Sequence, residues 1–136
     1  MEWYFKGKVF TEDMIADNVG FVYEITNLTN GKKYIGKKNF TQVRKKTFKK
    51  KKRPVRVTKS SDWQIYTGSS RSLQEDIKVL GEENFKKEII KLCKTKGEMS
   101  YYEIKAQLDN DVLLCDDYYN DYVGCRIHRN HLKKEE

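Results

Sequence analysis

The chain has 136 residues, with one proline and eight glycines that form no run, which is the size of a single domain and too small for two. Lysine and arginine number 28 against 20 acidic residues, so the net charge is +8 and the isoelectric point lies near 9.3, which indicates an anionic partner. No apolar run approaches the length of a membrane span and the first residues lack the order of a signal peptide, so we expect a cytoplasmic protein with no membrane partner.

The first predicted elements form an N-terminal arm over residues 1–18. Trp3, Phe5 and Val9 alternate with lysines, a pattern that predicts one short amphipathic strand. Thr11 is then placed to cap one or two helical turns that end near Ala16.

A β-hairpin follows the arm. Residues 19–26 and 32–37 are rich in aromatic and branched side chains and flank the turn-prone stretch Asn27–Gly31. Tyr23 and Tyr34 share one face of this hairpin if its loop holds an even number of residues. A loop centred on residues 28 and 29 makes them direct neighbours, and one centred on residues 30 and 31 separates them along the strands.

The excess positive charge lies in the next segment. From Phe40 the pattern predicts a helix, which gives way to a charged loop over residues 49–62. The stretch from Arg44 to Lys59 contains ten of the basic residues and no acidic one, so the rest of the chain is close to neutral. We expect this basic insertion, residues 45–62, to bind an anionic partner; for a nucleic acid, its low aromatic content favours contact with the backbone of double-stranded DNA over stacking on single strands. The residues expected to bind DNA are Lys45, Lys46, Lys49, Lys50, Lys51, Lys52, Arg53 and Arg56.

Two helices and a third strand complete the predicted fold. Ser72 and Glu75 have the spacing of a capping box, and Gly81 ends the helix that they begin. Residues 85–93 are predicted to form a core strand. A second helix opens at Ser100, with Tyr101, Ile104 and Leu108 as its apolar face. The fold class is therefore α+β, in one domain over residues 1–136.

The end of the chain is irregular and rich in tyrosine. We expect an edge strand over residues 122–127 and a tail over residues 124–136 that holds two exposed histidines. Three cysteines, at positions 93, 115 and 125, form no CxxC pair. This spacing excludes a disulfide scaffold and a zinc framework, and we interpret the cysteines as buried or half-buried thiols.

Several of these motifs together resemble the GIY-YIG nuclease superfamily, which includes the catalytic domains of phage homing endonucleases. The resemblance covers residues 19 to about 123. Its elements are Phe21-Val22-Tyr23, Tyr34-Ile35-Gly36, an arginine ten residues later, a glutamate in a later helix and an asparagine beyond it. It implies a small three-stranded antiparallel sheet flanked by helices, and a phage-type endonuclease in the host cytoplasm.

The resemblance also assigns roles to individual residues. It implies that Tyr23 and Tyr34 are paired catalytic tyrosines and that Arg44 binds a phosphate. Glu103 would be the ligand of Mg²⁺ or Mn²⁺. Lys37, Tyr66 and Asn120 complete the implied catalytic set.

The sequence departs from the family pattern in two places. The glycine of the first motif is displaced by one residue, to position 20. Many members carry His or Tyr one helical turn after the arginine, where this chain has Phe48, which cannot exchange a proton. Tyr66, beyond the basic insertion, is the candidate that would substitute for it.

Phosphodiester hydrolysis explains why these residue types suit the role. An arginine fork matches a phosphate, and a metal ion on a carboxylate relieves charge on the leaving oxygen. A tyrosine that acts as a base needs its pKa lowered, and we expect Lys37, Lys38 and the metal to lower it. Tyr23 is slightly preferred to Tyr34 as that base.

Each assignment has a structural alternative. The tyrosines could be ordinary sheet aromatics, Arg44 a solvated cation, Glu103 part of a capping box with Ser100, and Asn120 a turn residue. For the whole chain, the sequence predicts a metal-dependent endonuclease that nicks or cuts double-stranded DNA. The alternative is a noncatalytic nucleic-acid-binding module on the same fold. With no room for a separate C-terminal DNA-recognition domain, we expect sequence specificity either to be low or to be read by the insertion and the arm.

Overall fold

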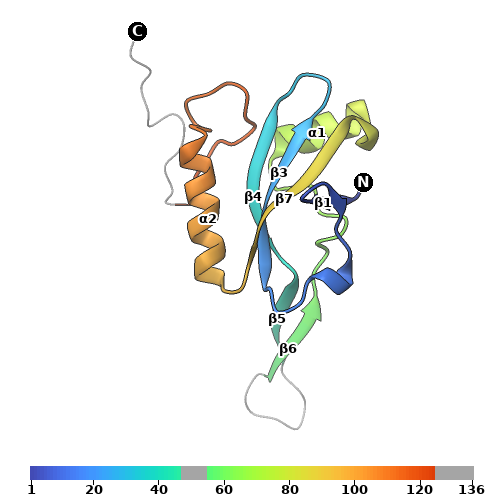
Figure 1. Ribbon diagram of the computed structural model, residues 1–136, viewed down its shortest axis with the longest axis vertical. Coiled ribbons are helices and arrows are strands. Elements are labelled where there is room, and N and C mark those ends of the chain that lie inside the picture. The colour runs from blue at the N-terminus through green and yellow to red at the C-terminus, as the bar shows by residue number, and fades with distance from the viewer. Residues whose placement is uncertain (47–54, 125–136) are drawn as a thin grey trace.

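The computed structural model describes residues 1–46 and 55–124, and for residues 43–46 and 55–58 it describes the backbone alone. The described part contains two sheets and two α-helices (Figure 1). None of its helices is long and apolar enough to cross a membrane. The elements are β1 (Trp3–Phe5), β2 (Lys8–Val9), η1 (Glu12–Met14), β3 (Gly20–Asn27), β4 (Lys33–Asn39), β5 (Thr41–Lys46), β6 (Val55–Ser60), α1 (Arg71–Leu80), η2 (Glu82–Asn84), β7 (Phe85–Cys93) and α2 (Lys96–Asp109).

The main sheet is larger than the sequence predicted. Its strand order is β2-β1-β7-β3-β4, and only the three strands β7, β3 and β4 form the expected antiparallel core. The arm supplies the other two strands, because β1 pairs in parallel with the free edge of β7 and β2 pairs with β1. The prediction of a single arm strand was wrong, since Lys6 and Gly7, both with positive φ, turn the chain between β1 and β2.

The two helices cover opposite faces of the sheet. Leu73 and Ile77 of α1 join an aromatic cluster that includes Trp3, Phe21 and Tyr23. Met99 of α2 packs in a second cluster on the other face, where alternate residues of β3 and β4 point. This alternation follows from the period-two geometry of strands, and it decides which side chains can meet.

The basic segment forms strands where a helix and a loop were predicted. Strands β5 and β6 pair antiparallel, from Thr41 opposite Ser60 to Lys46 opposite Val55, in a two-stranded sheet that extends from one end of the main sheet (Figure 1). The β-branched residues of both strands favour this structure over a helix. The tip of the predicted loop, residues 49–54, lies outside the described residues.

Both α-helices begin earlier than predicted. The N-cap of α1 is Ser70, whose hydroxyl accepts a hydrogen bond from the backbone of Leu73. The N-cap of α2 is Thr95, five residues before the predicted start. Tyr101 and Leu108, predicted to face the core, are 64% and 54% exposed, so the buried face of α2 was misassigned. Glu103 therefore lies inside α2 and forms no capping box with Ser100.

The chain after α2 packs along the outer edge of β4. The backbone of Lys33 donates to Asp117 O and accepts from Tyr119 N, at 2.8 and 2.7 Å. Of the predicted edge strand, residues 122–124 contribute a single bridge position, and residues 125–127 lie outside the described part together with the rest of the tail. Cys93 is buried and Cys115 half-buried, both as free thiols, while Cys125 is not among the described residues.

Candidate active site

The register of the hairpin places the two tyrosines on one face. Tyr23 pairs with Gly36 and Ile25 pairs with Tyr34, so the loop is even and the tyrosines are diagonal neighbours. The hairpin is centred between residues 29 and 30, midway between the two registers considered from the sequence. The ring centroids of Tyr23 and Tyr34 are 6.1 Å apart.

Gly36 makes room for the buried tyrosine. A Cβ at this position would lie 2.5 Å from Tyr23 Oη and 3.1 Å from the ring of Tyr34. The Tyr23 ring therefore crosses Gly36 and directs its hydroxyl toward β4, the outermost strand. Only glycine allows this approach, which explains the glycine of the second motif.

A third tyrosine joins the pair from the segment that precedes α1. The Tyr66 ring packs edge-on against Tyr23, with centroids 6.1 Å apart, and Lys38 Nζ lies 4.1 Å above the Tyr66 ring. Lys38 also forms an ion pair of 2.7 Å with Asp62. Ser69 Oγ lies 3.0 Å from Tyr34 Oη. The structure thus brings Tyr66 to the hairpin tyrosines across the whole basic insertion.

The environment raises the pKa of both hairpin tyrosines. Burial is the main cause for each, and their mutual proximity, Tyr66 and Glu103 raise the pKa of Tyr23 further, to well above its usual value of 10.0. The hydrogen bond with Ser69 opposes the rise for Tyr34. The expectation that Lys37 and Lys38 lower a tyrosine pKa was wrong for Tyr23 and Tyr34, because burial raises the pKa of both and each lysine is paired with a carboxylate.

Glu103 reaches the edge of β4 from α2. Its side chain is 13% exposed, and its carboxylate lies 4.0 Å from Lys37 Nζ and accepts a backbone hydrogen bond from Lys37. Lys37 Nζ also donates to Ser100 Oγ at 2.9 Å. Burial raises the pKa of Glu103, while Lys37 lowers it. The carboxylate thus lies one residue along β4 from the glycine that Tyr23 crosses.

Asn120 lies at the same edge, with its amide bound to the backbone of β4. Ile35 N donates to Asn120 Oδ1 at 3.1 Å, and Asn120 Nδ2 donates to Ile35 O at 2.8 Å. Gln107 Nε2 donates to the same carbonyl at 3.0 Å. Asn120 is 2% exposed, so it fixes the strand that carries Tyr34, Gly36 and Lys37.

The donor set at Glu103 fits only one style of metal binding. Within residues 1–46 and 55–124, no three His, Cys, Asp or Glu side chains gather as a metal-binding group. Mg²⁺ is commonly held by one or two carboxylates, with waters and substrate phosphates as its other ligands. A single half-buried carboxylate fits that arrangement and does not fit a cage made by the protein alone.

A pocket of about 320 Å³ opens beside Tyr34, and it includes an arginine that the sequence reasoning missed. Arg71, the first residue of α1, lines this pocket together with Ser69, Ser70 and Asn120. Its side chain is 95% exposed and lies 3.8 Å from Glu75. The signal for it was its place directly after the helix cap, which was misassigned to Ser72.

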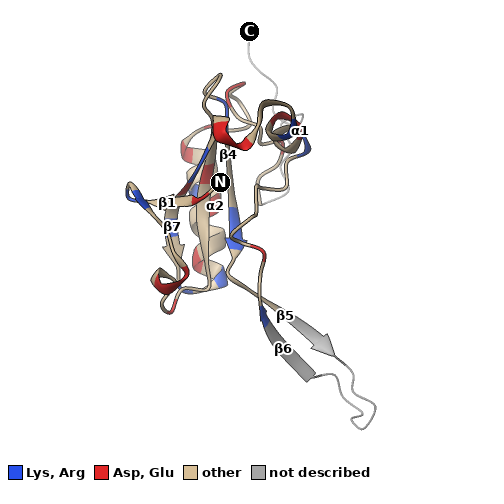
Figure 2. Cartoon of the chain, turned by 90° about the vertical axis from the view of Figure 1, so that its right-hand side faces the viewer, with Lys and Arg blue, Asp and Glu red and all other residues tan. Residues whose placement is uncertain are grey.

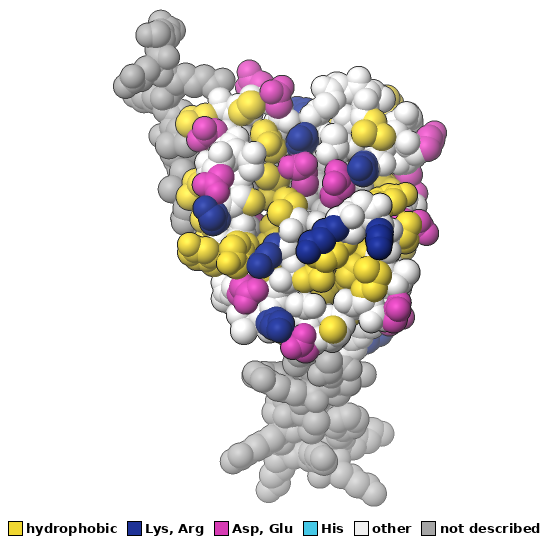
Figure 3. All heavy atoms as spheres, viewed as in Figure 1, with side chains coloured by type: hydrophobic (Ala, Val, Ile, Leu, Met, Phe, Trp, Pro, Cys, Tyr) yellow, Lys and Arg dark blue, Asp and Glu magenta, His cyan; other side chains and the backbone are white. Residues whose placement is uncertain are grey.

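The predicted phosphate-binding arginine, Arg44, and the predicted DNA-binding residues fall in the stretch of chain from β5 to β6. Arg44, Lys45, Lys46 and Arg56 lie on β5 and β6, where Lys45 pairs with Arg56, and their side chains are not described. Phe48 and residues 49–53 fall outside the described part. Elsewhere both signs of charge are spread over the coloured chain in Figure 2, and they are interspersed on the face seen in Figure 3.

Comparison with known proteins identifies the family. Residues 3–123 match the family described as "Putative endonuclease segE, GIY-YIG domain". The chain is 35% identical over 104 residues to "Putative endonuclease segE" of Enterobacteria phage T4. The match covers 76% of this chain and 41% of that relative, so the chain spans about two fifths of the relative's length. No solved structure matches the chain with significance. The chain therefore belongs to the phage-type branch of the GIY-YIG nuclease superfamily.

Proposed function

We propose that this protein is a divalent-metal-dependent endonuclease that hydrolyses phosphodiester bonds in double-stranded DNA. The observation that carries the proposal is the convergence at the edge of β4, where Tyr23 crosses Gly36 and the carboxylate of Glu103 meets Lys37. A buried phenol, a half-buried carboxylate and a lysine are not needed together to hold the sheet. They suit a reaction that needs hydrogen-bond donors and a cation beside a phosphate.

Glu103 is the residue proposed to hold Mg²⁺ or Mn²⁺. Such an ion, when bound, would stabilise charge on a phosphate oxygen and lower the pKa of a bound water. The protein contributes by keeping the carboxylate partly buried and in place through the backbone of Lys37. Lys37 Nζ, at 4.0 Å, balances the carboxylate charge until a metal ion binds.

The tyrosines are proposed to have different roles. With its pKa well above 10.0, Tyr23 stays a neutral phenol near pH 7 and acts as a hydrogen-bond donor that orients a water or a phosphate oxygen. Tyr34 is the better proton acceptor of the two, because its hydrogen bond with Ser69 opposes the rise in its pKa, and this reverses the preference for Tyr23 drawn from the sequence. Tyr66, which packs on Tyr23, is proposed to supply the proton-exchanging group that the family pattern places at position 48.

Two arginines are candidates for the phosphate contact. Arg44 has the family spacing from Tyr34 and lies on β5. Arg71 lines the pocket beside Tyr34. A guanidinium can donate two parallel hydrogen bonds to one phosphate, so Arg44→Ala and Arg71→Ala should be compared directly. We expect the alanine variant of the arginine that contacts the reacting phosphate to lose about tenfold or more in kcat. The other alanine variant should mainly lose affinity for DNA.

The basic insertion is proposed as the surface that grips DNA. It holds nine basic residues between Lys45 and Lys59, directly after Arg44, and the strands β5 and β6 extend from the end of the main sheet (Figure 1). A two-stranded β-ribbon is narrow enough for the major groove of DNA. Contacts from lysines to phosphates give affinity without reading the sequence.

A plasmid assay tests the proposal. The protein is incubated with supercoiled plasmid, with EDTA or with added Mg²⁺ or Mn²⁺, and the nicked and linear products are followed over time. We expect nicked plasmid only where a divalent metal is present. If no metal yields product while a gel shift shows DNA binding, the protein is a noncatalytic binding module and the proposal fails.

A further inference from the structure

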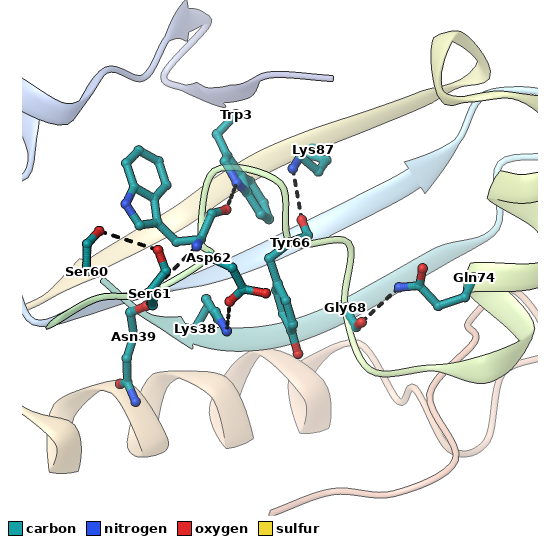
Figure 4. Close-up of polar contacts among 11 residues, drawn as sticks. Trp3, Lys38, Asn39, Ser60, Ser61, Asp62, Tyr66, Gly68, Gln74 and Lys87 are labelled. Atoms are coloured by element: carbon teal, nitrogen blue, oxygen red, sulfur yellow. Dashed lines mark hydrogen bonds and ion pairs between the residues drawn. The ribbon is translucent and has the colours of Figure 1, made fainter. Parts of the chain in front are cut away.

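The segment of residues 61–70, here called the connecting segment, joins β6 to α1 and carries two residues to the hairpin tyrosines. Tyr66 packs on Tyr23, and Ser69 meets the hydroxyl of Tyr34. The connecting segment belongs to neither sheet and lies across the main sheet (Figure 4). Because it has no strand partner, other groups must fix its position.

Side chains from other elements donate hydrogen bonds to the backbone carbonyls of the connecting segment. Trp3 Nε1 donates to Trp63 O at 2.7 Å, and Gln74 Nε2 donates to Thr67 O and Gly68 O, each at 2.8 Å. Two further carbonyls, in the middle of the segment, are bound by Lys87. Lys87 Nζ donates to Gln64 O at 3.2 Å and to Tyr66 O at 2.8 Å (Figure 4).

Lys87 is an unusual residue for its position. It lies on the central strand β7, between Trp3 of β1 and Ile25 of β3, and it is 0% exposed. Its ammonium lies 4.3 Å from the centroid of the Trp3 ring. Burial lowers its pKa from 10.5 to about 8, against a smaller opposing effect of Glu82. Burying a charge is costly, and an apolar residue of similar length would fill the same space.

The contacts of Lys87 explain what its charge is used for. A lysine has three donors on a long stem, so it can hold two carbonyls that no strand reaches. One of these carbonyls belongs to Tyr66, whose ring packs on Tyr23. We propose that Lys87 is a positioning residue, which fixes the connecting segment on the sheet and thereby sets Tyr66 against Tyr23. The effect of Lys87 on cleavage rests on the proposed nuclease function, whereas its hold on the connecting segment does not.

The first test compares Lys87→Met with Lys86→Met, an exposed neighbour on the same strand. Hydrogen exchange measured by mass spectrometry reports the connecting segment without any need for activity. In Lys87→Met we expect exchange about tenfold faster in residues 61–70, with β3 and α2 unchanged. If Lys87→Met exchanges in that segment at the same rate as the wild type, the proposal is overturned, whether or not the protein cleaves DNA.

The second test uses the plasmid assay under Mg²⁺. We expect Lys87→Met to lower kcat at least tenfold while KM for DNA stays within twofold, and Lys86→Met to match the wild type. Tyr66→Ala should lower kcat on its own, and adding Lys87→Met should then cost less than twofold. Full additivity of the two changes would show that Lys87 does not act through Tyr66.

A second variant, which loosens the other side of the segment, tests the proposal even if Lys87→Met does not fold. Gln74→Met, on the exposed side of α1, removes three hydrogen bonds to the segment: the two that Nε2 donates to Thr67 O and Gly68 O, and the one that Oε1 accepts from Thr67 Oγ1. We expect faster exchange in residues 66–69 and a fall in kcat of about threefold or more. Faster exchange with unchanged kcat would contradict the claim that the position of this segment governs the site. If wild-type protein shows no cleavage at all, the proposed function fails and the exchange results still decide the role of Lys87.

Discussion

Under the proposed function, the main sheet and the β5–β6 ribbon would divide two tasks that a nuclease must perform. Tyr23 on the main sheet is 1% exposed and packs against the rings of Tyr34 and Tyr66, each at a centroid distance of 6.1 Å, and Glu103 of α2 meets Lys37 at the edge of the same sheet. The ribbon carries the excess charge on two strands outside the sheet. Chemistry needs atoms held within tenths of an ångström, whereas the attraction of phosphates acts over about 8 Å at physiological salt. Changes in the sheet should therefore alter rate, and changes in the ribbon should alter affinity.

The largest effect is expected at Glu103. Glu103→Gln keeps the shape of the side chain but removes the charge proposed to hold the metal ion, so kcat should fall at least a thousandfold, about 4 kcal/mol of transition-state stabilisation. DNA affinity in a filter-binding assay should change less than threefold. Asp109→Asn, on the exposed end of α2, is the matched control and should cleave normally. Normal cleavage by Glu103→Gln would remove Glu103 from the site.

The close approach at Gly36 is the next point to test. In Gly36→Ala the new methyl group meets the hydroxyl of Tyr23, so we expect about a hundredfold loss of kcat and a loss of roughly 1–3 kcal/mol in the free energy of unfolding. Urea denaturation and the plasmid assay measure the two quantities. Gly97→Ala, where a Cβ meets no atom within 4 Å, is the control and should leave both unchanged or slightly raise stability. Equal behaviour of the two variants would show that Tyr23 does not need its place over Gly36.

Changes in the basic insertion should lower the affinity for DNA and leave kcat nearly unchanged, the reverse of changes in the sheet. Replacing Lys49 to Lys52 with alanine removes four of the charges in the insertion, so the dependence of log K on log salt should flatten by up to about 3.6, at 0.9 per phosphate contact. Affinity at moderate salt should fall about tenfold, and kcat at saturating DNA should stay within twofold. Titrations at several salt concentrations measure the slope. An unchanged slope would place the DNA surface elsewhere.

The smallest effect is a pH dependence of stability inside the sheet. Lys87 has a folded pKa of about 8 and an unfolded value of 10.5, so above pH 8 the unfolded chain binds more protons and the wild type gains stability as pH rises. Relative to Lys87→Met, the gain should be about 1 kcal/mol between pH 7 and pH 9, by urea denaturation. Glu82 is the acidic group that opposes the shift. If the difference in free energy of unfolding between the wild type and Lys87→Met does not vary with pH, burial does not disfavour the charged form of Lys87.

The sequence predicted well what depends on neighbouring residues. The hairpin, β7 and the middle of α1 follow from local periodicity and turn residues, and the shared face of Tyr23 and Tyr34 follows from period two once the loop is even. The β5–β6 ribbon was misread because its charge hid the alternation of Val55 and Val57. That pattern is typical of a strand.

The rest of the site depends on distant contacts that periodicity does not report. The position of Tyr66 is set by Lys87 and Trp3, which come from strands remote in the sequence, and charged residues are seldom expected in a core. The raised tyrosine pKa values arise from burial by the aromatic cluster around Tyr23. Composition could not predict either feature. The family resemblance identified Asn120, but only the structure reveals its two hydrogen bonds with the backbone of Ile35.

The closed outer edge of β4 also bears on how copies of this protein meet. An open edge strand is a template for pairing with another chain, and such pairing leads to aggregation. Here Lys33, Ile35 and Lys37 all have backbone groups engaged, by residues 117–120 and by Glu103. The residues that shape the candidate site thereby also prevent the sheet from growing by one more strand, so a copy of the protein cannot add to β4 without dismantling that site.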